Sequence, residues 1–303
     1  MTVGAGAGSA ARGPFETALQ RLVEPDVPVS AVRLAFLSDP SPADMTVFRS
    51  VWAVVPTERR RRIARALLTA HESDFQVCFK PLFQALLDDA DADVRSIGVD
   101  GLAEAGDARL VARLVKILRD DPEPSVRSRA ADGLGAYVEL GQLGRIEAGI
   151  ARTALEAVVD AAADEGEETE VRRRATASAG YADYAEAGHL IEAAIDSGLT
   201  SMRAGALRAM GNSADERWEL DVLAALADAL PEIRMEAARA AGSLTLGNAV
   251  PGLVALVDDA DHTVQSTAVW ALGEIGGDVA RGVLEAMLAE IEDPPLEEAI
   301  EDA

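Results

Sequence analysis

The sequence of 303 residues contains little of several residue types, and each shortage excludes a class of protein. Cys78 is the single cysteine, so an intramolecular disulfide and a cysteine-rich metal site are both excluded. Aromatic residues make up 4% of the chain, and its apolar stretches fall well short of the roughly 20 residues that a membrane span needs. Residues 1–13 lack the apolar core of a signal peptide. We therefore expect a cytoplasmic protein that does not associate with a membrane.

Positive charge is also scarce relative to negative charge. The chain has 28 Lys and Arg residues against 52 Asp and Glu residues, for a net charge of −24. Nucleic-acid phosphates would be repelled, so we expect no nucleic-acid partner. Hydrophobic residues reach 49%, which is enough to build a sizeable core. Much of this share is alanine, the residue with the highest helix propensity.

A short block recurs along the chain at a nearly constant interval. It begins with an apolar residue and an arginine, continues with small or apolar residues, and ends in glycine in most copies. The steps between successive block starts are 32, 45, 31, 31 and 31 residues. Such a period is typical of repeat proteins, in which each unit buries its apolar face only by stacking on its neighbours. The block starts are Val94, Val126, Val171, Met202, Ile233 and Val264.

Each repeat is predicted to form two helices joined by a polar turn. Within the block, apolar residues stand at offsets 0, 4, 5 and 8, which is one face of an α-helix. A second apolar stripe precedes it, and aspartates between the two, as at Asp88–Asp91 and Asp258–Asp261, are suited to cap the following helix. Glycine at offset 9 is predicted to be a helix C-cap. No segment alternates with the period of a strand, so no strand is expected.

The register extends beyond the six clear blocks in both directions. It predicts an all-α protein, a right-handed α-solenoid (superhelix) of about eight stacked antiparallel helix pairs plus a terminal half-repeat. Residues 1–13 are predicted to be a flexible tail and residues 14–303 a single solenoid. Within it, we expect divergent repeats over 14–77, regular repeats of about 31 residues over 78–276, an insertion near 161–170, and a capping half-repeat with an acidic tail over 277–303.

The block resembles HEAT repeats, in the short HEAT-like form found in phycobilin lyases and in many bacterial scaffold proteins. The residues that carry the resemblance are Asp91–Arg95, Pro124–Ala131 and Asp261–Gly273. In such repeats the arginine at offset 1 commonly pairs with turn acids of neighbouring units, and the second helices line the concave surface. The motif identifies an architecture and says little about function.

The residue types that usually carry chemistry do not form a recognisable site. His71, His189 and His262 lie in different repeats, too far apart for metal-ligand spacing on one helix. HEAT-like deoxyhypusine hydroxylases bind iron through several His-Glu pairs, whereas this chain has only His71–Glu72. Cys78 is interpreted as a buried structural residue, and the paired aspartates as turn caps. We therefore predict no catalytic residue, no metal site and no cofactor.

The second helices carry more information at offsets 2, 3 and 6, which lie away from the apolar stripe. In a chain of net charge −24, these positions are rich in arginine and poor in obvious counter-charges. Arginine and tryptophan commonly anchor interfaces, and arginine forms paired hydrogen bonds with carboxylates and phosphates. The alternative is a solvated face neutralised by turn acids. The predicted partner-binding groove comprises Arg129, Arg173, Arg174, Arg208, Met235, Arg239 and Trp270.

Three functions remain open at this point. The first is a non-catalytic scaffold that binds an acidic or phosphate-bearing protein segment along its concave groove. The second is a bilin-lyase-like enzyme or a subunit of one, which a bound pigment would favour. The third is a subunit of a larger assembly, docking through its N-terminal repeats or its unfinished C-terminal repeat.

Overall fold

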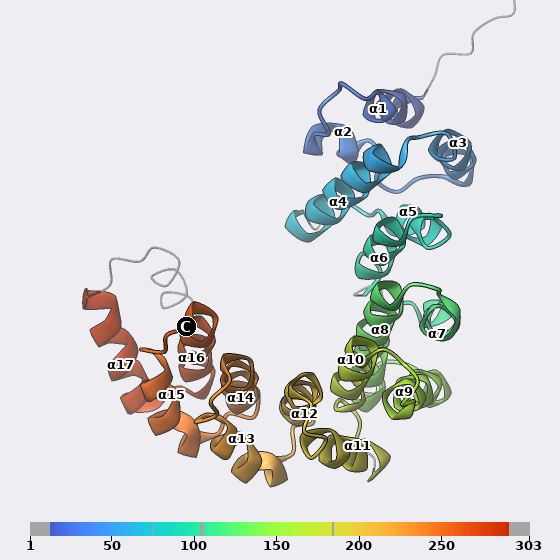
Figure 1. The fold of residues 1–303 in the computed structure, drawn as a ribbon. Helices are drawn as coiled ribbons and strands as arrows, with labels where there is room; N and C mark the ends of the chain where they lie inside the picture. Colours follow the sequence, from blue (N-terminus) through green and yellow to red (C-terminus); the bar gives the residue numbers. More distant parts are fainter. Residues whose placement is uncertain (1–12, 75, 104–105, 184, 291–303) are drawn as a thin grey trace, which may run out of the picture. The chain divides into compact units, whose positions relative to one another are not determined.

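The computed structural model describes residues 13–74, 76–103, 106–183 and 185–290 (Figure 1). Across these ranges the chain forms α-helices, three short 3-10 helices and connecting turns, without a strand. The predicted all-α class is therefore confirmed. The chain divides into two compact units, residues 1–105 (unit 1) and 106–303 (unit 2), which we describe in turn.

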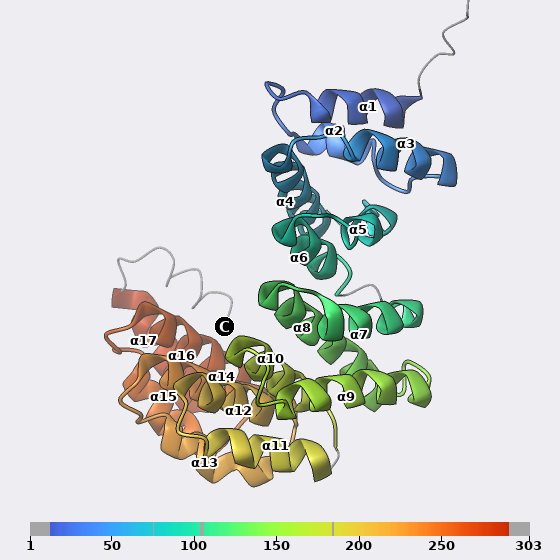
Figure 2. The ribbon, with the colours of Figure 1, turned by 45° about the vertical axis from the view of Figure 1, so that its right-hand side comes forward.

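Unit 1 contains three helix pairs packed in two layers. The first helices α1, α3 and α5 stack in chain order, and so do the second helices α2, α4 and α6 (Figure 2). The core between the layers includes Leu19, Phe48, Ile63, Leu67 and Phe83, all fully buried. The helices are α1 (Pro14–Val23), α2 (Ala31–Ala35), α3 (Pro42–Trp52), α4 (Thr57–Ser73), α5 (Lys80–Leu86) and α6 (Ala92–Asp100).

Unit 2 continues the same pattern over five further pairs and one last helix. The second helices α8, α10, α12, α14 and α16 contact one another in chain order, and in Figure 1 they form the inner row of this unit. The first helices α7, α9, α11, α13 and α15 form the outer row. The bounds are α7 (Val111–Asp120), α8 (Pro124–Gln142), α9 (Ala148–Ala163), α10 (Thr169–Ala179), α11 (Ala185–Ile195), α12 (Thr200–Asn212), α13 (Glu219–Ala225), α14 (Pro231–Ser243), α15 (Val250–Leu256), α16 (His262–Ile275) and α17 (Gly277–Glu290).

The helices described make eight pairs followed by α17, in agreement with the predicted number of repeats. The α-solenoid architecture is thus confirmed. The helix α17 is the first helix of the predicted terminal half-repeat. The second helix expected near Leu296, the acidic end of the chain and the predicted tail, apart from Gly13, lie outside the described residues.

The 45-residue step between Val126 and Val171 does not arise from an insertion near 161–170, contrary to expectation. That stretch forms the end of α9, a short loop and the start of α10. The additional residues instead lengthen α8 to 19 residues and α9 to 16 residues. Residues in a helix bury apolar side chains and hydrogen-bond their own backbone groups. Lengthening the two helices therefore costs less free energy than ordering a long loop.

The glycine at offset 9 acts as the predicted C-cap in α10, where Gly180 has an ordinary right-handed φ of −57°. Gly211 and Gly242 instead lie inside their helices. A Cβ on Gly211 would stand 2.9 Å from Cα of Ala240, and one on Gly242 would stand 2.9 Å from Cα of Ala271. These glycines therefore allow neighbouring second helices to approach closely.

Aspartates cap helices as predicted. The side chain of Asp91 accepts a hydrogen bond from the backbone N–H of Val94 at the start of α6. Asp261 accepts hydrogen bonds from the backbone N–H groups of Thr263 and Val264 at the start of α16. Each bond satisfies a donor that the first helical turn leaves unpaired.

Candidate functional site: an arginine-lined hollow on the inner helix row

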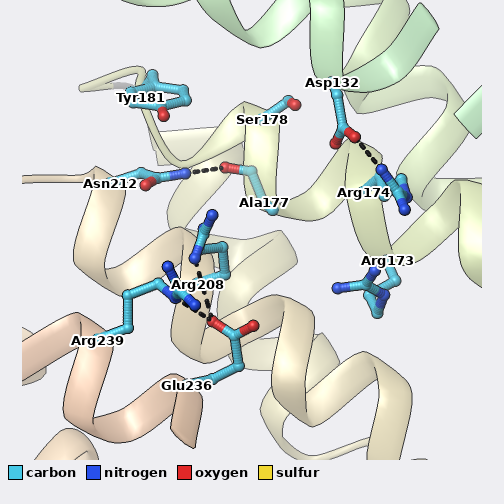
Figure 3. A pocket seen from close by; sticks show the side chains of 10 residues that line it. All are labelled: Asp132, Arg173, Arg174, Ala177, Ser178, Tyr181, Arg208, Asn212, Glu236 and Arg239. Carbon is cyan, nitrogen blue, oxygen red and sulfur yellow. Dashed lines mark hydrogen bonds and ion pairs between the residues drawn. The ribbon is translucent and has the colours of Figure 1, made fainter. Parts of the chain in front are cut away.

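Four of the predicted groove arginines line one hollow of about 380 Å³ on the inner row of unit 2 (Figure 3). Arg173 and Arg174 project from α10, Arg208 from α12 and Arg239 from α14. The repeat places Arg208 and Arg239 side by side because both stand at offset 6 of successive second helices, and Arg173 and Arg174 join them from offsets 2 and 3 of the preceding one. The remaining lining residues are Asp132, Ala177, Ser178, Tyr181, Asn212 and Glu236.

Two of these arginines are already paired with carboxylates. The Nε atom of Arg173 lies 2.7 Å from Oε2 of Glu170, and Nε of Arg174 lies 2.5 Å from Oε1 of the same residue. Arg174 also forms an ion pair with Asp132 of α8. The expectation that these arginines meet few counter-charges is therefore wrong for this half of the site. The hydrogen bonds from the two guanidinium groups lower the pKa of Glu170 to about 2.

Arg208 and Arg239 share a single buried carboxylate, Glu236. Its Oε2 atom lies 3.5 Å from Nη1 of Arg208 and 3.5 Å from Nε of Arg239. Glu236 is only 7% exposed, and its Oε2 atom and Nε of Arg239 lack a hydrogen-bond partner among the residues described. Burial, together with the positive charge of Arg208, lowers the pKa of Arg239. This pair of arginines therefore carries one positive charge more than the carboxylate that it shares.

Polar side chains close the opposite wall of the hollow. Nδ2 of Asn212 donates a hydrogen bond to the backbone oxygen of Ala177 over 3.0 Å. Tyr181 and Ser178 stand above it in Figure 3. Burial and the nearby Glu139 raise the pKa of Tyr181, so its hydroxyl keeps its proton at neutral pH. The site combines a basic wall with neutral donors and acceptors.

The other three predicted groove residues do not line this hollow. Arg129 is exposed on α8. Met235 is half-buried and packs against the apolar core of unit 2. Trp270 is 37% exposed on α16, with the tip of its ring against Gly242 of α14. Trp270 therefore flanks the hollow on the α14 side.

The sequence pattern does not predict the acids or the other polar residues of this hollow, and Glu236 is the most consequential of them. It stands at offset 3 of its block, next to Met235. The available signal is its register, because Arg239 follows three positions later on the same helix face, and Arg208 stands one repeat before Arg239 at the same offset. Two cations converging on one position require a counter-charge.

Three of the arginines at offset 1 pair with an acid of the neighbouring repeat, as the resemblance implied, whereas Arg172 donates to the backbone oxygen of Ala162 in its own repeat. Arg127 makes a two-bond ion pair with Glu167 at 2.7 and 2.8 Å. Arg234 does the same with Asp259 at 2.7 and 2.8 Å, and Arg203 bonds Asp228 at 2.5 Å. Each partner belongs to the turn of the following repeat. These arginines connect neighbouring repeats and do not take part in the hollow.

Of the other sequence candidates, His189 and His262 are exposed, whereas His71, Cys78 and Asp89 are built into the packing. His71 is half-buried beside the ring of Phe83, with the ring centroids 5.5 Å apart. Cys78 is half-buried, whereas the sequence predicts a fully buried residue. Its backbone N–H donates a hydrogen bond to the hydroxyl of Ser38. Asp89 accepts a hydrogen bond from Nε1 of Trp52 at 2.7 Å.

The described residues contain no group of three or more His, Cys, Asp and Glu side chains placed to hold a metal ion. Among the same residues, the helices include none with the length and apolar character that crossing a membrane requires.

Comparison with known proteins identifies the class to which the chain belongs. The family model for HEAT repeats matches residues 79–180 and 219–303, which together are more than half of the sequence. The chain therefore belongs to the HEAT-repeat family. No curated protein matches it.

Solved structures that match this chain do so at low sequence identity. The complex of CpcE and CpcF of phycocyanin lyase from Nostoc sp. PCC7120 is 17% identical, with 96% of this chain and 100% of that chain covered and a TM-score of 0.56. Human deoxyhypusine hydroxylase in complex with glycerol is 20% identical, covering 95% and 93%, with a TM-score of 0.37. The karyopherin Kap121p bound to Nup53p is 16% identical, covering 90% and 33%, with a TM-score of 0.44.

Proposed function

We propose that this HEAT-repeat protein is a non-catalytic scaffold that binds an acidic or phosphate-bearing segment of a partner protein in the hollow between α8 and α14. The observation that carries the proposal is the shared carboxylate of Glu236, 3.5 Å from both Arg208 and Arg239. Two guanidinium groups with one buried counter-charge favour the entry of a further anion. The segment would be recognised by charge in the hollow and by burial against the adjoining helices.

The bilin-lyase-like alternative is supported only by the shared fold, because the phycocyanin lyase complex is 17% identical to this chain. Its existence as a complex of two chains agrees equally with a protein-binding role. In the described part of the chain, the arginines and carboxylates of the hollow lie in ion pairs with one another. We therefore prefer the scaffold function.

The hollow can be tested by replacing its ion cluster with amides. In the hollow variant, Arg208→Gln, Glu236→Gln and Arg239→Gln remove both cations together with the buried carboxylate, so that no charge is left uncompensated. An array of random 12-residue peptides carries Glu, phosphoserine or Ser at its centre. We expect the wild type to select Glu or phosphoserine peptides, and the hollow variant to bind them at least about tenfold more weakly.

A matched control removes the same charges from the outer row of the same unit. Arg119 lies 3.2 Å from Asp160 there, and Arg281 is exposed on α17. The outer variant, Arg119→Gln, Asp160→Asn and Arg281→Gln, should bind the selected peptides as the wild type does. Equal binding by the wild type and the hollow variant, with both folded by circular dichroism, would remove the hollow as the binding site.

A further inference from the structure

The residues at offset 6 form a continuous row across the inner helices of unit 2. The row places one residue on each second helix, in the order Asp132, Ala177, Arg208, Arg239 and Trp270. Three contacts show that neighbouring helices meet along this row. Arg174 of α10 pairs with Asp132 of α8, Glu236 of α14 bridges to Arg208 of α12, and the Trp270 ring of α16 touches Gly242 of α14. A segment that crosses the helices would therefore meet these residues in sequence.

The side chain of Trp270 lies against α14, the helix that carries Arg239 of the arginine pair. Its ring tip lies against Gly242, three residues after Arg239 and on the same face of α14. The indole is 37% exposed, whereas Trp52 and Trp218 are 7% and 5% exposed. From that same face, the guanidinium of Arg239 extends in the other direction, toward Arg208 of α12 (Figure 3). An anion site on the α12 side and an apolar site on the α16 side thus adjoin one face of α14.

The charges in the hollow indicate the kind of anion. Among the described residues in these ion pairs, four are arginines and three are carboxylates, namely Asp132, Glu170 and Glu236. One positive charge is in excess, so one carboxylate completes the balance. A phosphate dianion would bring a second negative charge next to buried Glu236, in a chain of net charge −24. The arrangement favours an aspartate or glutamate side chain.

The spacing of the two sites follows from helix packing. Neighbouring helices lie roughly 8–10 Å apart, and an extended chain in the polyproline II conformation rises about 3.1 Å per residue and presents every third side chain on the same side. We propose that the hollow and Trp270 together bind an extended acidic segment of a partner protein, in which an acidic residue lies between Arg208 and Arg239 and a large apolar residue three positions away lies on Trp270. This inference rests on the proposed function and adds the partner's motif to it.

The motif can be tested with the tightest Glu peptide selected by the wild type. Leu is placed in turn at every position from one to six residues on either side of the Glu, and the dissociation constants are measured by fluorescence anisotropy. Leu three positions away should strengthen binding about fivefold, the effect of partly burying one apolar side chain, and other spacings less than about twofold. The same peptide should protect tryptophan fluorescence from acrylamide quenching, because Trp270 is the most exposed tryptophan.

Variants separate this inference from the function on which it rests. Trp270→Ala should abolish the gain from Leu while keeping the Glu-dependent binding, and Trp270→Phe should restore part of the gain. Glu-dependent binding without a preferred spacing would overturn the motif and leave the proposed function standing. Equal binding by the hollow variant would overturn both. Replacement of Glu by phosphoserine should not tighten binding, and a tenfold gain from it would overturn the preference for a carboxylate.

Discussion

Arginine has two distinct roles in unit 2, and its position on the second helix decides which one it takes. At offset 1 it points along the turn and bonds an acid of the following repeat, as Arg127 and Arg234 do. On α10, α12 and α14, arginines at offsets 2, 3 and 6 project from the inner row into the hollow, where Arg208 and Arg239 meet a single buried carboxylate. The same side chain therefore connects repeats in one register and creates a binding surface in another.

The acidic partner of the α10 arginines gives a pH-dependent prediction. Arg173 and Arg174 hold the folded-state pKa of Glu170 at about 2, below its ordinary 4.5. A lowered carboxyl pKa contributes stability that is full above about 4.5 and is lost as the pH falls toward 2. Glu170→Gln should cost about 1 kcal/mol or less at pH 7, because this carboxylate is about half exposed.

Urea unfolding of the wild type and Glu170→Gln at pH 7, 5, 4 and 3.5 measures this effect. The difference in unfolding free energy should be constant from pH 7 to 5 and should shrink below about pH 4.5. A difference that stays the same down to pH 3.5 would show that the ion pairs with Arg173 and Arg174 do not stabilise the folded state.

At the scale of the helix, close approach between second helices is the feature that keeps the inner row compact. The glycine at offset 9 of one repeat faces the residue at offset 7 of the next, and the facing residue is small in each case. The facing pairs are Gly135 with Ser178, Gly180 with Ala209, Gly211 with Ala240, and Gly242 with Ala271. Added side-chain volume at offset 9 would push neighbouring helices apart and disturb the hollow between them.

Gly180 gives the sharpest test of this close packing. A Cβ at this position would overlap the backbone oxygen of Ala209 on α12, which cannot rotate away. Gly180→Ala should therefore lower the free energy of unfolding by roughly 1–3 kcal/mol. The control is Gly282→Ala in α17, where a Cβ meets nothing within 4 Å. This change should stabilise the helix by about 0.5–1 kcal/mol, since alanine is the better helix former. Two destabilised variants of similar size would contradict the packing argument.

The sequence predicts the helices better than it predicts the contacts between them. The 31-residue period locates the helix pairs because buried stripes repeat at a fixed interval in the sequence. It also brings Arg208 and Arg239 together, since both stand at offset 6 and equal offsets lie side by side. It does not show that Asp132 and Glu170 neutralise Arg174, because that depends on how side chains from two helices meet. The role of the offset-9 glycines that lie inside their helices was mistaken for the same reason.

At the scale of the whole molecule, the net charge of the chain is negative, whereas the charge excess in the hollow is positive. The net charge of −24 repels an acidic segment at a distance, while the arginines attract it at contact. Salt screens the long-range repulsion more strongly than the attraction at contact. At about 0.1 M ionic strength, exposed charges more than roughly 10 Å apart are largely screened, whereas partly buried pairs are screened much less. The kinetics of binding should therefore differ from those of an ordinary pair of opposite charges.

For a peptide of net negative charge that binds the hollow, the association rate should rise about two- to threefold between roughly 20 and 150 mM salt. Over the same range the dissociation rate should also rise, because the contacts with Arg208 and Arg239 weaken as they are screened. Stopped-flow anisotropy of the tightest Glu peptide measures both rates. The outer variant, which loses the same charges from the opposite layer of unit 2, should show the same salt dependence. An association rate that falls with salt would mean that the peptide is steered by a positive field, and would place its binding site on a basic surface other than this hollow.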